Sequence, residues 1–266
     1  MPLVAVDIGN TRLKLGVYDS LPSQGAGLPE PRHTLSVTID GLSEITPWLA
    51  PHEPGEVSWW IGSVQRSFTT ELVDWLRARG AKKITLLCAG DLPLVVDLPR
   101  PDMVGIDRLL AAVGVNALRE AGRPAIIVDL GTAVTVDLVS AEGAFEGGAI
   151  LPGIAMSARA MHEFTDLLPL IEMAELHEPP PEVGKDTVAA MRSGLFWGTI
   201  GAARELIARM HDRGRPAASS GTAAPQVFLT GGAAASVAKL LAPDAQFVPN
   251  LTLGGIALTA ARLSRE

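Results

Sequence analysis

Two short stretches of this chain share one pattern, an aspartate that ends an apolar run and is followed by a glycine turn. The first is DIGNT at Asp7–Thr11 and the second is DLGT at Asp129–Thr132, so their aspartates lie 129 − 7 = 122 residues apart in a chain of 266. Each stands between two runs of strand length and opens a series that passes into alternating strands and helices. This repeat predicts two similar α/β domains that face each other across a cleft. Each should hold a mostly parallel sheet with an antiparallel hairpin at its start.

The remaining apolar runs follow the same order in both halves. The first half has the strand-like runs HTLSVTI, VSWWIGSV and ITLLCAG, where Cys88 is expected as a buried strand residue, and a helical pattern from Ile106 to Gly122. The second half has the strand-like run GAFEGGAILPG and a long helix from about Thr187 to Met210, and it ends as strand, helix, strand and helix. We expect a first domain at residues 1–116 and a second at 117–266.

The residues of the first turn suit phosphate chemistry. A glycine lets consecutive backbone N–H groups point outward, and such a nest binds phosphate oxygens. Asn10 and Thr11 add side-chain donors, Lys14 adds a positive charge, and Asp7 could hold Mg²⁺ or its waters. An ordinary hairpin explains the first turn equally well. The second turn favours phosphate, because two facing loops can hold both ends of a triphosphate.

The stretch VGIDR, which ends at Arg108, appears where a helix is expected to begin. Asp107 could cap the helix, since free backbone N–H groups stabilise a carboxylate there. It could instead be a general base that takes a proton from an attacking hydroxyl, with Arg108 orienting the acceptor. Position alone favours the cap. The glycine turns GGAILPG and LTGGAA close loops, and the second could also let the backbone approach an adenine or ribose.

Several classes of function are disfavoured. A net charge of −7 and a sequence pI near 5.3 give no general attraction to nucleic acid or an anionic membrane. One cysteine permits no intramolecular disulfide, and the five histidines lack metal-ligand spacing. No Walker A loop and no dinucleotide-binding glycine pattern is present. No signal peptide or membrane span is expected, so the sequence predicts a cytoplasmic protein.

Taken together, the motifs DIGNTRLK, GIDR, VDLGTAVTVD, GGAILPG, TVAAMRSGLFWG and FLTGGAA resemble those of type III pantothenate kinases, and the resemblance covers nearly the whole chain. It implies duplicated ribonuclease H-like domains of the actin/Hsp70/sugar-kinase superfamily. It further implies ATP-dependent phosphorylation of pantothenate to 4'-phosphopantothenate, the first step of coenzyme A biosynthesis, in a homodimer with a shared active site. The implied cofactors are ATP with Mg²⁺ and a monovalent cation, K⁺ or NH4⁺.

The resemblance also assigns roles to individual residues. Asp107 would be the catalytic base, Asp129 would bind the monovalent cation, and Asp7 would hold the magnesium of Mg-ATP, directly or through water. Thr187 would reach pantothenate in the neighbouring subunit. The ATP-binding residues would be Asp7, Ile8, Gly9, Asn10, Thr11, Arg12, Leu13, Lys14 and Thr132. The substrate-binding residues would be Gly105, Ile106, Asp107, Arg108 and Thr187.

One position departs from the family pattern. The family usually has a tyrosine seven residues before the glycine of its Gly-x-Asp-Arg motif, and here that position is Leu98. Two alternatives to the pantothenate kinase stay open from the residues. One is a regulatory or accessory protein on the same scaffold, and the other is a kinase of the superfamily that acts on another small molecule.

Overall fold

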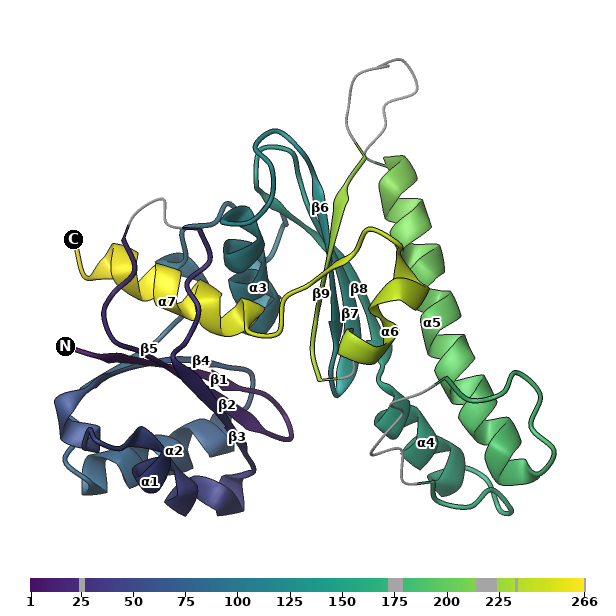
Figure 1. The fold of residues 1–266 in the computed structure, drawn as a ribbon, viewed down its shortest axis with the longest axis horizontal. Coiled ribbons are helices and arrows are strands. Elements are labelled where there is room, and N and C mark those ends of the chain that lie inside the picture. The colour runs from purple at the N-terminus through teal and green to yellow at the C-terminus, as the bar shows by residue number, and fades with distance from the viewer. Residues whose placement is uncertain (24–26, 172–178, 214–223, 233, 266) are drawn as a thin grey trace. The chain divides into compact units, whose positions relative to one another are not determined.

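The computed structural model describes residues 1–23, 27–171, 179–213, 224–232 and 234–265 (Figure 1). The chain forms two compact units. Unit 1 contains Met1–Leu118 and Asn250–Glu266, and unit 2 contains Arg119–Pro249.

Unit 1 is built on a five-stranded sheet with the order β3-β2-β1-β4-β5. Its strands are β1 (Leu3–Ile8), β2 (Leu13–Tyr18), β3 (His33–Val37), β4 (Ser58–Ser63) and β5 (Lys83–Leu86). Its α-helices are α1 (Ile45–Leu49), α2 (Arg66–Ala78), α3 (Ile106–Asn116) and α7 (Leu251–Leu263). Alternate residues of β1 and β2, such as Val6 and Leu15, pack against α1 and α2 in one core. The opposite face of the sheet is covered by α3 and α7.

Unit 2 repeats this sheet with the order β8-β7-β6-β9-β10. Its strands are β6 (Ala125–Leu130), β7 (Ala133–Val139), β8 (Phe145–Pro152), β9 (Gln226–Thr230) and β10 (Gln246–Phe247). Its α-helices are α4 (Ile154–Glu163), α5 (Thr187–Arg213) and α6 (Ala234–Leu241). Three antiparallel strands followed by two parallel ones occur in the same order in both sheets. The predicted α/β class with duplicated domains is therefore confirmed, whereas antiparallel and parallel pairings are equally frequent rather than mostly parallel.

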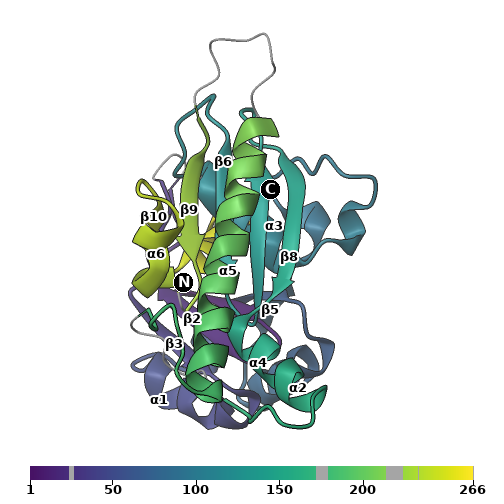
Figure 2. The ribbon, with the colours of Figure 1, turned by 90° about the vertical axis from the view of Figure 1, so that its right-hand side faces the viewer.

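The long helix α5 lies along the sheet of unit 2 (Figure 2). Phe196, Ile200 and Ala203 are buried against β6 and β7 in the core of this unit, and Trp197, Leu206 and Ile207 are half-buried at its edge. The apolar residues of α5 thus pack mainly within their own unit. The exposed face of the helix carries Gly194, Gly198 and Gly201, where an added Cβ would meet no heavy atom of the described chain within 4 Å.

The C-terminal helix α7 belongs to unit 1, although the sequence boundary at residue 116/117 had assigned it to the second domain. It is apolar on almost every side and packs against β1, β4 and α3. The two helices approach each other closely. A Cβ on Gly255 of α7 would overlap the carbonyl oxygen of Leu110 in α3. A Cβ on Gly114 of α3 would lie 2.7 Å from the carbonyl oxygen of Leu251 in α7. These paired glycines let the two helices meet backbone to backbone.

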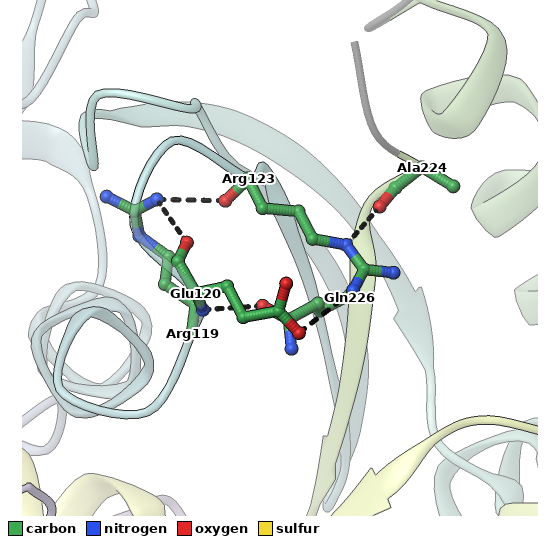
Figure 3. Close-up of polar contacts among 5 residues, drawn as sticks. All are labelled: Arg119, Glu120, Arg123, Ala224 and Gln226. Carbon is green, nitrogen blue, oxygen red and sulfur yellow. Dashed lines mark hydrogen bonds and ion pairs between the residues drawn. The ribbon is translucent and has the colours of Figure 1, made fainter.

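The helix α3 ends at Asn116, six residues before the predicted end at Gly122. The following segment is held in unit 2 by a polar network (Figure 3). Arg119 Nη1 donates to the carbonyl oxygens of Arg123 and Ala141, at 2.8 Å each, and the Glu120 N–H donates to Gln226 Oε1 at 2.7 Å. Arg123 Nε donates to the Ala224 carbonyl oxygen at 2.6 Å. The Glu120 N–H thus bonds to Gln226, whereas a continued helix would have directed it to the Asn116 carbonyl oxygen.

The prediction that Cys88 is a buried strand residue is wrong. Strand β5 ends at Leu86, and Cys88 is exposed. The Cys88 N–H donates to Asp91 Oδ2 at 2.7 Å, which starts a short 3-10 helix at Ala89–Asp91. A local side-chain bond to the backbone thus ended the strand.

Candidate functional site

The first turn lies at the carboxyl end of β1, and its two charged residues share one face of the sheet. Asp7 is directly opposite Lys14 of β2 and Gly62 of β4. Side chains at paired positions point to the same side, and an added Cβ on Gly62 would lie 2.5 Å from Leu110 Cδ1 of α3. Asp7 and Lys14 therefore lie on the sheet face that α3 covers.

The turn itself spans Gly9–Arg12 and is closed by one backbone hydrogen bond, in which the Gly9 N–H donates to the Arg12 carbonyl oxygen at 3.1 Å. Asn10, Thr11 and Arg12 are exposed. Ile8 and Leu13, which flank the turn, are fully buried in the core of unit 1. Of the predicted ATP-binding residues, these two can therefore offer only main-chain atoms.

The Gly-x-Asp-Arg segment lies beside this end of β1. The Val64 N–H donates to the Ile8 carbonyl oxygen at 3.0 Å, which extends the pairing of β1 and β4. A Cβ built on Gly105 would lie 3.7 Å from Val64 Cγ1. Unit 1 thus brings together the first turn and residues 105–108, which are almost one hundred positions apart in sequence. Val64 is the connecting residue, and its role was not visible in the sequence.

Asp107 is half-buried in the first turn of α3. Its Oδ1 accepts the Arg108 N–H at 2.9 Å, and the same N–H also donates to the Gly105 carbonyl oxygen at 3.1 Å, so the carboxylate contacts the backbone at the helix start without pairing an otherwise unbonded N–H. The N-cap residue is Gly105, however, and Asp107 Oδ2 makes no hydrogen bond to any residue within the described ranges. The side chain therefore combines a fixed orientation with one oxygen that can accept a proton.

The space beside Gly105 does not admit a side chain. A Cβ at this position would lie 2.6 Å from Asp107 Oδ1, inside van der Waals contact. The backbone of Gly105 has φ −56°, which any residue can adopt. The absence of a side chain therefore serves the placement of the Asp107 carboxylate.

In unit 2, the second turn is shorter and rests on β8. Residues Gly131 and Thr132 join β6 to β7, and the Gly131 N–H donates to the Ala133 carbonyl oxygen at 3.1 Å. The Gly153 N–H donates to the Thr132 carbonyl oxygen at 3.1 Å. A Cβ on Gly153 would overlap that same oxygen and lie 2.6 Å from the Gly131 carbonyl oxygen. The last glycine of GGAILPG thus supports the turn, which goes beyond simple loop closure.

The glycine turn LTGGAA approaches the same place from β9. Asp129 is paired in parallel with Thr230, and the next residue, Gly231, has φ +95°. A Cβ on Gly231 would lie 2.5 Å from Asp129 Oδ1 and 2.6 Å from the Leu130 carbonyl oxygen. Unit 2 therefore gathers Asp129, Thr132 and two glycines from separate strand ends. Gly231 belongs to the LTGGAA turn that the sequence offered either as loop closure or as a contact to adenine or ribose, whereas Gly153 was given no binding role.

The two turns differ in charge. The position opposite the aspartate is Lys14 in the first turn and Thr135 in the second. Arg12 adds a second cation to the first turn, whereas Thr132 adds a hydroxyl to the second. The first turn is thus suited to the more charged end of an anionic ligand, and the second to a ligand bound by hydroxyl and backbone groups.

Thr187 is exposed at the first position of α5 in unit 2. Asp186 caps this helix, because its Oδ1 accepts the Ala189 N–H at 2.8 Å. Thr187 lies at a groove of about 510 Å³ between α4 and the start of α5. The groove is lined by Met161, Leu168, Thr187, Ala190, Met191, Gly194 and Leu195.

Two further features bear on the site. Leu98, at the position of the family tyrosine, is half-buried in unit 1 and offers no polar group. Within the described ranges, no three His, Cys, Asp or Glu side chains are grouped so as to hold a metal ion, and no helix is both long and apolar enough to cross a membrane. A cation here would need oxygens from its ligand as well as from Asp7 or Asp129.

Known proteins are similar to this chain over most of its length. A type III pantothenate kinase of Desulfosudis oleivorans is 34% identical over 263 residues, which cover 96% of each chain. A type III pantothenate kinase of Dehalococcoides mccartyi is 35% identical over 263 residues, 96% of this chain and 95% of the relative.

One solved structure, a protein of Campylobacter jejuni assigned to the Baf family of transcriptional activators, is similar in fold. It has a TM-score of 0.58 at 17% identity and covers 99% of this chain and 100% of its own. The model of the type III pantothenate kinase family matches residues 3–209, which include both turns and the Gly-x-Asp-Arg motif. The chain belongs to the type III pantothenate kinase family.

Proposed function

We propose that this protein phosphorylates pantothenate at the expense of ATP and forms 4'-phosphopantothenate, which commits pantothenate to coenzyme A biosynthesis. The observation that supports this most is the placement of Asp107 beside the end of β1, where the first phosphate turn begins. Membership of the family supplies the substrate. The transfer moves the terminal phosphoryl group of ATP to a hydroxyl of pantothenate, and ADP leaves.

Asp107 is the general base of this proposal. Its Oδ1 is engaged by the Arg108 N–H, so Oδ2 takes the proton of the pantothenate hydroxyl as the oxygen attacks the phosphorus. Arg108 and the backbone of Gly105 and Ile106 orient the acceptor. A positioned base of this kind contributes roughly 10²–10⁴-fold to a rate.

The two turns bind the phosphates of ATP in this proposal. Arg12 and Lys14 neutralise the charge of the triphosphate, Asn10 and Thr11 of the exposed turn donate hydrogen bonds to it, and Thr132 donates from the second turn. Asp7 holds Mg²⁺ directly or through water. Asp129, beside the carbonyl-rich strand ends of unit 2, binds the monovalent cation, K⁺ or NH4⁺, since hard cations prefer oxygen ligands. We further propose a cytoplasmic homodimer in which Thr187 completes the pantothenate site of the partner subunit.

The experiment is coupled ADP release by the purified protein, with pantothenate compared against glucose, N-acetylmannosamine and acetate, and with K⁺ compared against Na⁺. We expect turnover with pantothenate alone among these acceptors, stimulation by K⁺, and a product whose mass is that of phosphopantothenate. Turnover with a sugar or acetate would identify another kinase of the superfamily. The absence of turnover with every acceptor, in a protein that still binds ATP, would favour an accessory role.

A further inference from the structure

The junction between β4 and α2 contains a cluster of polar groups to which the proposed reaction gives no role. Ser63 is the last residue of β4, Gln65 is the N-cap of α2, and Thr69 belongs to this helix. All three residues are half-buried in unit 1. Ser63 is paired with Ile8, the last residue of β1, so the cluster lies beside the strand end that leads into the first turn.

Three oxygen atoms lie at the centre of this cluster. Ser63 Oγ and Thr69 Oγ1 are 2.6 Å apart, and they lie 3.1 Å and 2.8 Å from the Gln65 carbonyl oxygen. The two hydroxyl protons can occupy two of these three contacts at a time. The Gln65 N–H donates to Ser63 Oγ at 3.0 Å, and the Thr69 N–H donates to the Gln65 carbonyl oxygen at 3.1 Å. Each hydroxyl is thus bonded to the other and to the backbone on both sides of residue 64.

Val64 stands between the two backbone positions that the cluster fixes. Its N–H donates to the Ile8 carbonyl oxygen at 3.0 Å, which ties it to the start of the first turn. A Cβ built on Gly105 would lie 3.7 Å from Val64 Cγ1 and 2.6 Å from Asp107 Oδ1. The Val64 methyl group and the Asp107 carboxylate therefore border the same space.

The cluster also connects the two helical layers of unit 1. Thr69 belongs to α2, whose Leu72 and Leu76 are fully buried on one face of the sheet. Gly105 precedes α3, which covers the opposite face. Apolar packing has no preferred direction, whereas hydrogen bonds depend on distance and angle. The hydroxyls of Ser63 and Thr69 can therefore fix the end of β4 more narrowly than the apolar core does.

We propose that Ser63 and Thr69 are positioning residues for phosphoryl transfer. Their hydroxyls hold Val64, and Val64 in turn keeps the Gly-x-Asp-Arg segment at a fixed separation from the first turn. This deepens the proposed function and rests on Asp107 as its base. Both parts that Val64 joins act in the transfer step, and a misplacement of about 1 Å can cost a reaction about 100-fold. Loss of the cluster should therefore lower kcat more than it raises either KM.

The first test compares two neighbouring threonines of α2. Thr69 Oγ1 lies within hydrogen-bond distance of the carbonyl oxygen four residues before it, and exposed Thr70 makes the same kind of bond, to Arg66 at 3.2 Å. Thr69 alone adds the contact with Ser63. We expect Thr69→Val to lower kcat about 10-fold, with both KM values within about 2-fold of wild type, and Thr70→Val to leave kcat unchanged. Thr69→Ser keeps the hydroxyl and should restore kcat. Equal kcat in Thr69→Val and Thr70→Val would overturn the proposal.

A double-mutant cycle tests whether the cluster acts through the base. Ser63→Ala should lower kcat about 10-fold in the wild type but less than about 2-fold in Asp107→Asn, because no base is then left to be positioned. The same loss in both backgrounds would mean that Ser63 only supports the fold, and the proposal would be wrong.

A third measurement does not depend on activity. In amide NMR spectra of the full-length protein, Thr69→Val should shift the signals of Val64, Gly105 and Arg108, and Thr70→Val should leave them in place. Unshifted Gly105 and Arg108 signals would overturn the positioning, whether or not the protein is active. Shifted signals in a protein that does not phosphorylate pantothenate would support the positioning and refute the proposed reaction alone.

Discussion

At the scale of single residues, the proposed mechanism depends most on the carboxylate of Asp107. We expect Asp107→Asn to lower kcat by about 10²-fold or more while ATP binding and the unfolding midpoint stay close to the wild type, because an amide keeps the shape but cannot take the proton. Gly105→Ala, whose Cβ would press on Asp107 Oδ1, should lower kcat in the same direction but less. Steady-state kinetics and nucleotide binding measure both. Activity of Asp107→Asn within a few-fold of wild type would reduce this residue to a structural role.

A separate prediction concerns the pH dependence of folding stability and rests on Tyr18. It is the single tyrosine of the chain, it is buried, and its hydroxyl has no hydrogen-bond partner in the described structure. Burial raises the pKa of Tyr18 well above its ordinary value, and the negative charge of Glu30 raises it further. Because the folded pKa exceeds the unfolded one, the contribution of Tyr18 to stability is fully present below pH of about 10 and is lost as pH rises above it.

The comparison that measures this is the urea midpoint of wild type and Tyr18→Phe across alkaline pH. Phe removes an unsatisfied buried hydroxyl, so we expect it to be neutral or stabilising by about 1 kcal/mol near neutral pH. Its advantage should grow above pH of about 10, where the unfolded wild type alone releases the tyrosine proton. A difference that stays constant through this range, or a tyrosinate absorption band in the folded wild type, would contradict the prediction.

At the scale of elements, the ends of strands position the second turn. We expect Gly153→Ala to raise the KM for ATP several-fold with little change in the KM for pantothenate, since its Cβ would displace the Gly131–Thr132 turn. Its backbone at φ −68° suits alanine, so the contact alone is tested. Gly201→Ala, in open space on α5, is the control and should stabilise the fold by up to about 1 kcal/mol. Equal ATP affinity in the two variants would show that Gly153 does not support the nucleotide site.

Elements also show what the sequence could predict. The hairpin at Asp7 and its repeat at Asp129 were predictable because residues close in sequence form them, and both α5 and the family motifs followed local patterns. The neighbourhood of Val64 and Gly105 was not predictable, since it depends on the pairing of β1 with β4. Likewise, α3 ends at Asn116 because Arg119 and Glu120 find partners on the Ala141 turn and on Gln226, far along the chain. Helical spacing alone carries no signal of such competition.

At the scale of the whole molecule, chain order and spatial order differ at the C-terminus. The repeat of two turns suggested that everything after residue 116 forms one domain, but Leu251–Leu263 returns to unit 1 and completes the layer beside α3. A helix that is buried on nearly every side needs a neighbour that admits close approach, and Gly114 supplies it. Periodicity shows that such a helix is buried but does not show against which sheet.

The shared active site is the prediction that concerns the molecule as a dimer. If Thr187 of one chain completes the pantothenate site whose base is Asp107 of the other, Asp107→Asn and Thr187→Ala homodimers should both be impaired. In a heterodimer of the two, one site carries both defects and the other carries neither. Co-expression with two different affinity tags allows the heterodimer to be purified, and its kcat per dimer should approach half that of the wild type. A purified heterodimer no more active than its parents would mean that each chain holds a complete site of its own.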